Sequence, residues 1–397
     1  MFRLMIVSFM VVNCECKILN PVILVPGDGG SQIEAKLNKS TANPWCDLHT
    51  KGYYNLWVNQ EELFFLTVDC FTDNMRLVYD QHKHVTRNSP GVETRIPGWG
   101  HTKTVEWLDP ERVTDVYTNK PNQGVTFQIC SRTFLVGQLK DASGIKGGRF
   151  LDMHSDHLTF HPLKAPNEFA DFFKNFKALI EETYTLNNNT KVVLLGHSMG
   201  NPTTLYFLNH QPQAWKDKFI QSFISLAGVW GGSVKSLILL ATVRQQQRSM
   251  PSTAWLMPSD KFWGKDEILV ERPGRNYTVH DFKQLFTDMN LIDGWHIRKD
   301  TANLIRSLTP PGVEVHCIHG HDVQTPQTPE KLVFKGHMWN DKQLNVKMGD
   351  GDGTVNIRSL KGCLHWQGKQ PQKIYHLPIE GADHMEILGN KDVIAYL

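Results

Sequence analysis

Residues 191–200 read Lys-Val-Val-Leu-Leu-Gly-His-Ser-Met-Gly, and they are the most informative part of the chain for its architecture. Its first half is a short apolar run of the kind that forms a buried strand. Its second half is a G-x-S-x-G pentapeptide centred on Ser198, and helical patterning follows over residues 203–208. The pentapeptide alone is also compatible with an ordinary glycine-rich turn. Between a strand and a helix, however, it is typical of a sharp turn that presents a nucleophilic serine.

Four further apolar runs predict strands. They cover residues 21–25, 219–226, 313–318 and 373–377. Upstream of Ser198, residues 168–184 carry aromatic and aliphatic side chains at three- and four-residue spacing, which indicates a helix packed on a sheet. Strands that alternate with helices predict an α/β fold with a largely parallel sheet.

A serine hydroxyl is a poor nucleophile at neutral pH, so a histidine must accept its proton and a carboxylate must orient the histidine. In chains with this pentapeptide in this context, the order is serine, acid, histidine. His384 follows the last predicted strand and is the candidate base. The acid is expected in the turn of residues 349–354, where Asp350 or Asp352 can serve. The alternative, a calcium-binding or solvated loop, lacks the remaining ligand positions of an EF-hand.

Acyl transfer also requires two backbone N–H groups that stabilise an oxyanion. One is expected from Met199, the residue after the nucleophile, and the other from Asp28, in the loop after the first strand. The glycines around Asp28 also suggest a phosphate-binding loop, but they match neither a G-x-G-x-x-G nor a Walker pattern. These residues favour covalent catalysis by serine, which requires no metal and no organic cofactor.

The composition fits one enzyme core with insertions. The 397 residues are 40% hydrophobic and 21% charged, which suffices to bury a substantial core. The formal charge is +2 and no run is rich in lysine or arginine, which argues against nucleic-acid binding.

Three features indicate the secretory pathway. Met1-Phe2-Arg3 precedes an apolar stretch too short to span a bilayer, so residues 1–16 are expected to be a signal peptide. Glycosylation sequons begin at Asn38, Asn188 and Asn276. Five cysteines follow the signal without zinc-like spacing, and in an oxidising compartment they favour disulfides with one thiol left over.

Longer motifs surround the candidate residues. They are Val25-Pro26-Gly27-Asp28, His197-Ser198-Met199-Gly200-Asn201, residues 211–218, Trp230-Gly231-Gly232, residues 349–356 and His384-Met385-Glu386. Together they resemble the lecithin:cholesterol acyltransferase family over most of the chain. The resemblance implies an α/β-hydrolase fold with Ser198 as nucleophile, His384 as base and Asp352, rather than Asp350, as acid.

The resemblance also implies three structural parts. The α/β-hydrolase core would comprise residues 17–34, 81–230 and 311–397, the small membrane-binding subdomain residues 35–80, and the cap residues 231–310. Implied disulfides join Cys46 to Cys70 and Cys317 to Cys363, which leaves Cys130 unpaired.

The first of these disulfides would enclose an apolar stripe. Its members are Leu56, Trp57, Leu63, Phe64 and Phe65. The resemblance implies that they contact a lipid surface, as exposed apolar side chains do in peripheral proteins. Without the resemblance, the same stripe is also compatible with an amphipathic helix of the core.

In function, the resemblance implies a phospholipase A and O-acyltransferase. Such an enzyme forms a serine acyl-enzyme from a glycerophospholipid and passes the acyl chain to water or a lipid alcohol. We expect a monomer, in the lysosome or outside the cell, that acts at a phospholipid membrane or lipoprotein surface. The alternatives are a neutral lipase or sterol acyltransferase on the same fold, and an inactive lipid-binding homologue.

Two segments depart from the family pattern. Residues 112–164 do not resemble it, and residues 241–247, which correspond to its active-site lid, are shortened. A zinc site is conceivable in the first segment, but the spacing of its candidate ligands fits no regular helix face. These candidates are His154, Asp156, His157 and His161.

Overall fold

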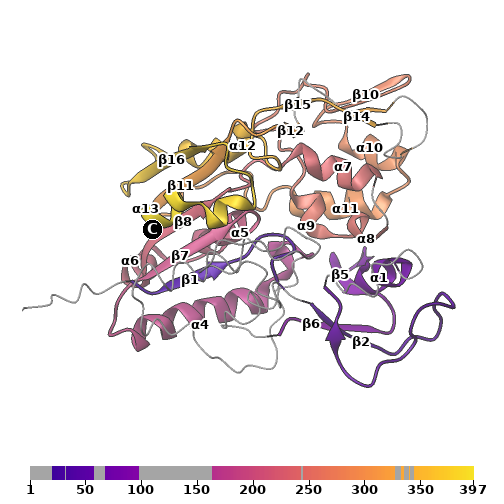
Figure 1. The fold of residues 1–397 in the computed structure, drawn as a ribbon, viewed down its shortest axis with the longest axis horizontal. Coiled ribbons are helices and arrows are strands. Elements are labelled where there is room, and N and C mark those ends of the chain that lie inside the picture. The colour runs from indigo at the N-terminus through magenta and orange to yellow at the C-terminus, as the bar shows by residue number, and fades with distance from the viewer. Residues whose placement is uncertain are drawn as a thin grey trace, which may run out of the picture.

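The computed structural model describes residues 20–31, 33–57, 68–97, 163–242, 245–326, 332–334, 339 and 344–397. Its centre is a five-stranded sheet in the order β1-β7-β8-β11-β16, in which every pairing is parallel. The strands are β1 (Val22–Val25), β7 (Val192–His197), β8 (Ile220–Leu226), β11 (Glu314–His321) and β16 (Ile374–Glu380). The five predicted strands are therefore confirmed as neighbours in one sheet (Figure 1).

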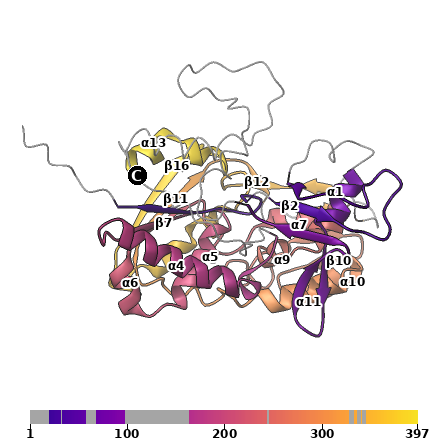
Figure 2. The same cartoon turned by 90° about the horizontal axis from the view of Figure 1, so that it is seen from below.

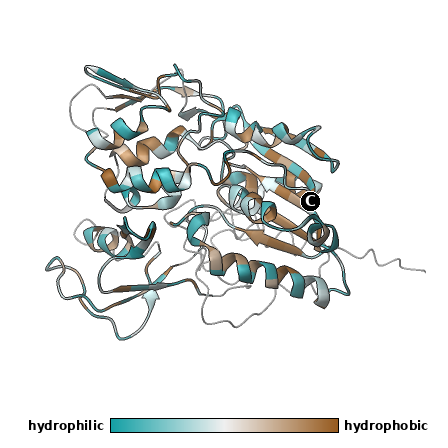
Figure 3. Ribbon diagram, turned by 180° about the vertical axis from the view of Figure 1, so that it is seen from behind, coloured by the Kyte–Doolittle hydropathy of each residue, from teal (hydrophilic) through white to brown (hydrophobic). Residues whose placement is uncertain are grey.

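Helices cover both faces of this sheet, as Figure 2 shows. One face carries α4 (Ala170–Leu186), α5 (Gly200–Asn209) and α6 (Gln213–Phe219). The predicted apolar stripe of α4 is buried there, and the ring centroid of its Phe176 lies 4.6 Å from that of Phe207 on α5. The other face carries α13 (Lys391–Tyr396). Because the sheet is covered on both sides, its central strand β7 is buried along its whole length, and the central strands are largely hydrophobic (Figure 3).

The connection between β7 and α5 identifies the architecture. β7 ends at His197 and α5 begins at Gly200, so the predicted sharp turn lies at the carboxyl end of a central strand. A parallel sheet with helices on both faces and a serine at such a turn is the α/β-hydrolase fold.

A small subdomain precedes α4 in the chain. Its antiparallel sheet contains β2 (Glu34–Leu37), β3 (Tyr54–Asn55) and β6 (Val92–Arg95). The helix α1 (Val68–Met75) and the hairpin of β4 (Leu77–Asp80) and β5 (Val85–Asn88) complete it. Because β6 pairs with β2, this unit continues to residue 95, beyond the boundary at residue 80 that the resemblance implies.

Leu56 does not lie at a lipid-contacting surface of this subdomain, so that prediction is wrong. Its side chain is fully buried in an apolar cluster with Ile33 and Met75. Trp57 is half-buried and packs against the same cluster. The other members of the predicted stripe lie outside the described residues: Leu63, Phe64 and Phe65. A large apolar side chain that this subdomain does expose is Trp45, at 67%.

The cap follows β8. Its helices are α7 (Val234–Thr242), α8 (Gln245–Arg248), α9 (Pro251–Trp255), α10 (Phe282–Asp288) and α11 (Ile292–Thr301). Its sheet contains β9 (Val270–Arg272), β10 (Arg275–Tyr277), β13 (Leu332–Phe334) and β14 (Leu344–Val346). β13 pairs with both β9 and β14, so Leu332–Phe334 and Leu344–Val346 extend the sheet that β9 and β10 begin, although the resemblance implies that they belong to the core.

The remaining elements connect these parts. They are β12 (Thr325–Pro326), β15 (Met348–Gly349), α12 (Ile357–Leu360) and the 3₁₀ turns η1 (Pro166–Glu168), η3 (Lys361–Trp366) and η4 (Glu386–Gly389). Among the described residues there are two disulfide bonds, Cys46–Cys70 in the subdomain and Cys317–Cys363 between β11 and η3. They are the pairs that the resemblance implies.

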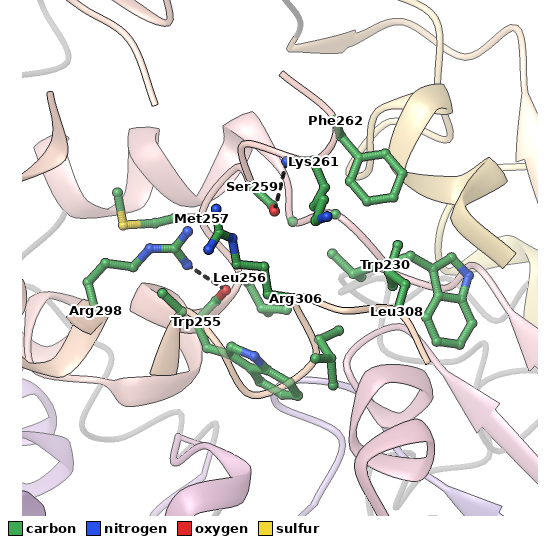
Figure 4. Close-up of a pocket in the computed structure, with 15 residues that line it drawn as sticks. Trp230, Trp255, Leu256, Met257, Ser259, Lys261, Phe262, Arg298, Arg306 and Leu308 are labelled. Carbon is green, nitrogen blue, oxygen red and sulfur yellow. Dashed lines mark hydrogen bonds between the residues drawn. The ribbon is translucent and has the colours of Figure 1, made fainter. Parts of the chain in front are cut away.

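Arg298 on α11 fixes a loop of the cap (Figure 4). Its guanidinium donates to the carbonyl oxygens of Ala254 (3.0 Å), Trp255 (3.0 Å) and Pro258 (3.1 Å). The first two lie in the last turn of α9, where carbonyls lack the regular helical donor; the Ala254 carbonyl also accepts the backbone N–H of Met257 (3.5 Å). Burial lowers the pKa of Arg298 to about 10, so the side chain stays charged at neutral pH. The cavity beside it measures about 20 Å³, which is room for about one water molecule.

Replacing Arg298 with Met is expected to lower the free energy of unfolding by about 2–4 kcal/mol, because three carbonyl oxygens lose a charged donor. The Lys variant keeps the charge without the forked donors, so its stability should lie between those of the Met variant and the wild type. Urea unfolding of the three proteins measures this order. A Met variant as stable as the wild type would contradict the assigned role.

Candidate active site

Ser198 lies at a strained turn between β7 and α5. Its φ of 51° falls in the left-handed region that residues other than glycine rarely adopt. Its backbone N–H donates to the carbonyl of Leu226 at the end of β8 (3.0 Å). A Cβ on Gly200 would lie 2.3 Å from the carbonyl oxygen of Val25, so only glycine allows β1 to pass this close. Strain that the surroundings enforce is typical of functional sites.

The three side chains of the predicted triad meet at this turn. Ser198 Oγ lies 2.9 Å from His384 Nε2, and His384 Nδ1 lies 2.7 Å from Asp352 Oδ2. The exposed fractions of Ser198, His384 and Asp352 are 8%, 5% and 0%. Such a chain of contacts gives a serine hydroxyl a base for its proton and gives the base a carboxylate that fixes its tautomer.

The turn around Asp352 holds its carboxylate in place. Oδ1 accepts the backbone N–H groups of Thr354 (3.0 Å) and Val355 (2.7 Å), while Oδ2 faces His384. The alternative acid, Asp350, is directed elsewhere and accepts the backbone N–H of Asp322 (2.7 Å). The geometry therefore favours Asp352 as the partner of the histidine.

The glycine loop after β1 lies against the nucleophile. A Cβ on Gly27 would lie 2.7 Å from the Cβ of Ser198. The loop turns tightly, because the Gly30 N–H donates to the Gly27 carbonyl (3.0 Å), and Asp28 lies within that turn. Met199 precedes the first residue of α5, where backbone N–H groups have no intrahelical acceptor. These positions suit the N–H groups of Asp28 and Met199 as oxyanion donors, a role that stays a prediction.

Two buried residues contribute to the site without having been predicted. His197 Nε2 lies 2.9 Å from the backbone carbonyl of His384. The Asn201 amide donates to the carbonyls of Leu226 (2.8 Å) and Ser198 (3.2 Å). Both residues belong to the motif around the nucleophile. The motif alone carries no signal for their partners, which are backbone carbonyls.

A pair of histidines lies near the acid. Nε2 of His319 on β11 lies 2.9 Å from Nε2 of His376 on β16. Burial lowers the pKa of His319 to about 4, and the nearby His376 and Lys361 contribute to this shift. The Gly320 carbonyl and Asp352 act in the opposite direction. Burial also lowers the pKa of His376.

The other predicted residues are placed as follows. The three sequon asparagines, Asn38, Asn188 and Asn276, are exposed. The signal peptide, Cys130 and the zinc candidates His154, Asp156, His157 and His161 lie outside the described residues, as do lid residues 243–244. In the part of the chain that is described, no group of three or more His, Cys, Asp or Glu side chains is placed to hold a metal ion. None of the helices in those residues has the length and hydrophobicity of a transmembrane span.

Comparison with known proteins assigns this geometry to a family. The model of the lecithin:cholesterol acyltransferase family matches residues 53–391. The chain belongs to this family. Lysosomal phospholipase A and acyltransferase from Rattus norvegicus is 39% identical over 391 residues, which cover 95% of this chain and 89% of the relative. Phosphatidylcholine-sterol acyltransferase from Gallus gallus is 35% identical over 382 residues, or 93% and 87% of the two chains.

A solved structure supports the fold of this member of the lecithin:cholesterol acyltransferase family. A chain of the crystal structure of the Tle4-Tli4 complex has a TM-score of 0.50 and 10% identity, and the match covers 94% of this chain and 96% of that one. At this identity, the similarity concerns the fold alone.

The Asn variant of Asp352 is expected to lower kcat by about 10⁴-fold, because an amide no longer fixes the histidine tautomer or stabilises its positive charge. Asn at position 350 provides the matched control and should change kcat by less than about 3-fold, since Asp350 bonds elsewhere. Hydrolysis of a soluble fatty acyl ester measures both variants, with thermal unfolding to verify folding. If the variant at 350 were the more damaging one, the assignment of the acid would be wrong.

His319 is expected to make the protein less stable in acid. The unfolded chain binds a proton at this residue below about pH 6.5, whereas the folded chain binds it only near pH 4. The free energy of unfolding should therefore fall as the pH decreases from about 6.5 to about 4, by up to about 3 kcal/mol from this residue. Urea unfolding at several pH values should show a shallower pH dependence for the variant His319→Gln. Equal pH dependence in both proteins would contradict this cause.

Proposed function

We propose that this chain is a phospholipase A and O-acyltransferase in which Ser198 is the nucleophile, His384 the general base and Asp352 the acid. The observation that carries the proposal is the 2.9 Å contact between Ser198 Oγ and His384 Nε2 at a strained turn. Membership of the lecithin:cholesterol acyltransferase family, with phospholipase and acyltransferase relatives, supports a lipid ester as the substrate.

The first half of the reaction forms an acyl-enzyme. Ser198 Oγ attacks the ester carbonyl carbon of a glycerophospholipid while its proton passes to Nε2 of His384. The N–H groups of Met199 and Asp28 then stabilise the tetrahedral oxyanion. Cleavage of the carbon–oxygen bond to the glycerol releases a lysophospholipid, which takes the proton from His384.

The second half reverses the roles. A hydroxyl group gives its proton to His384 and attacks the acyl carbon, and Ser198 leaves with the proton returned by His384. Water gives a free fatty acid, and a lipid alcohol gives a new ester. A sterol is the second candidate acceptor, because some relatives are named phosphatidylcholine-sterol acyltransferase. All steps use side chains and backbone groups of this chain, so the mechanism needs no cofactor.

The substrate lies in a lipid surface, and we propose that the small subdomain binds this surface. Trp45 and Leu48 are 67% and 37% exposed, and Cys46 between them is tied to α1 by a disulfide. A fixed loop that exposes apolar side chains suits insertion between lipid head groups. This assigns contact with lipid to the stretch 45–48, whereas Leu56 is buried.

We further propose that the protein acts in the lysosome or outside the cell. One group of relatives is named lysosomal phospholipase A and acyltransferase, and another phosphatidylcholine-sterol acyltransferase. The three sequon asparagines are exposed, as glycosylation requires. The two disulfides fit an oxidising secretory route. Activity that peaks at acidic pH would favour the lysosome of the two.

The variant Ser198→Ala is expected to lose at least about 10³-fold in phospholipid turnover while it keeps the wild-type unfolding midpoint. The assay follows fatty acid release from vesicles of labelled phosphatidylcholine. Parallel vesicles contain ceramide or cholesterol, so that a labelled acylceramide or sterol ester identifies the acceptor. Unchanged turnover in the Ala variant would exclude the proposed nucleophile.

A fluorophosphonate probe separates this enzyme from an inactive lipid-binding homologue. The probe reacts with an activated serine irrespective of the lipid substrate, so the wild type should be labelled and the Ala variant should not. A wild-type protein that binds vesicles but takes up no label would be a lipid-binding protein, and the proposed activity would be wrong.

A further inference from the structure

We infer that His197 is a positioning residue of this active site, which holds the backbone of His384 so that the base stays within reach of Ser198. The inference rests on the proposed function, since it assigns a role relative to the proposed base. The hydrogen bond of His197 goes to the backbone of His384, so its proposed action is exerted through the base.

One hydrogen bond carries the inference. His197 Nε2 lies 2.9 Å from the backbone carbonyl oxygen of His384. A carbonyl oxygen only accepts, so Nε2 must carry the proton and donate it. The His197 side chain is 4% exposed, and its ring centroid lies 5.0 Å from that of His384. A donor in such a dry position holds its acceptor without competition from water.

The bond matters because His384 lies in a connection rather than in a regular element. β16 ends at Glu380 and η4 begins at Glu386, so no strand or helix fixes the intervening backbone. The His384 N–H donates to the Asp352 carbonyl (2.8 Å), and the His384 carbonyl accepts from His197. Both backbone groups of the base are therefore held from outside its own segment.

His197 is also the covalent neighbour of the nucleophile. It is the last residue of β7, a strand that is buried along its whole length. One residue thus connects the nucleophile to the base: His197 is covalently bonded to Ser198 and hydrogen-bonded to the His384 backbone. We expect this link to keep the distance between the two catalytic side chains constant when the turn moves. A misplacement of about 1 Å between reacting groups is enough to cost about 10²-fold in rate.

The oxyanion loop packs on the same imidazole. A Cβ on Gly27 would lie 3.2 Å from His197 Nδ1 and 2.7 Å from the Cβ of Ser198. One buried ring thus lies between the strand that carries the nucleophile, the connection that carries the base and the loop expected to supply an oxyanion donor.

The variants Gln, Asn and Leu at position 197 test this role. The Gln amide nitrogen can reach the position of Nε2, whereas the Asn nitrogen lies near that of Nδ1 and falls short of the His384 carbonyl. Leu has a similar volume and no donor. We expect kcat on phosphatidylcholine vesicles to fall less than about 10-fold in the Gln variant and about 10²-fold in the Asn and Leu variants, with KM unchanged. The rate of fluorophosphonate labelling should fall in the same order, because it reports activation of Ser198 without lipid binding.

Thermal unfolding midpoints separate positioning from stability. Gln and Asn are both buried amides and should lower the midpoint by similar amounts, so a kcat difference between them reports the hydrogen bond. If the Leu variant does not fold, the Gln and Asn pair carries the test alone. Equal kcat and equal labelling rates in those two variants would overturn the inference, as would a loss confined to KM. Failure of the proposed function is distinct, because the wild-type protein itself would then take up no label.

Discussion

The site depends on how closely separate backbone segments approach one another around Ser198. A Cβ at Gly200 would lie 2.3 Å from the Val25 carbonyl oxygen, and a Cβ at Gly27 would lie 2.7 Å from the Cβ of Ser198. Both distances are far below van der Waals contact. Glycine is therefore required at these two positions because neighbouring backbone segments pass so close to them, and not because the chain must be flexible there. The packed neighbours in turn hold Ser198 at a φ of 51°, a conformation that persists only where the surroundings enforce it.

The parallel sheet explains why residues far apart in the chain converge on this turn. Ser198 follows β7 and His384 follows β16, while Asp352 forms a bridge with Val323 just after β11. Parallel strands end at the same edge, so the segments that leave them meet there. The sheet thus assembles the three groups, and the local turns set their orientation.

The apolar runs and the serine motif were enough to predict the five strands and the turn at Ser198, because both signals are local. They made His384 a candidate only, and the family resemblance was needed to choose His384 as base and Asp352 as acid. Features that depend on non-local pairing gave no such signal. The burial of Leu56 depends on Ile33 and Met75, and the pairings of β6 with β2 and of β13 with β9 join segments that are far apart in the chain. His197 escaped prediction for a further reason: its partner is a backbone carbonyl, which every residue possesses.

In the proposed mechanism, the triad does not choose between hydrolysis and acyl transfer. Both reactions consume one acyl-enzyme and use the same base, so they differ only in which hydroxyl reaches the acyl carbon. The subdomain is well placed to influence this, because a Cβ on Gly29 in the oxyanion loop would lie 2.7 Å from the ring of Trp57. The part proposed to bind lipid therefore touches the loop proposed to bind the oxyanion. Docking on a lipid surface would bring lipid alcohols to a site whose three triad side chains are at most 8% exposed.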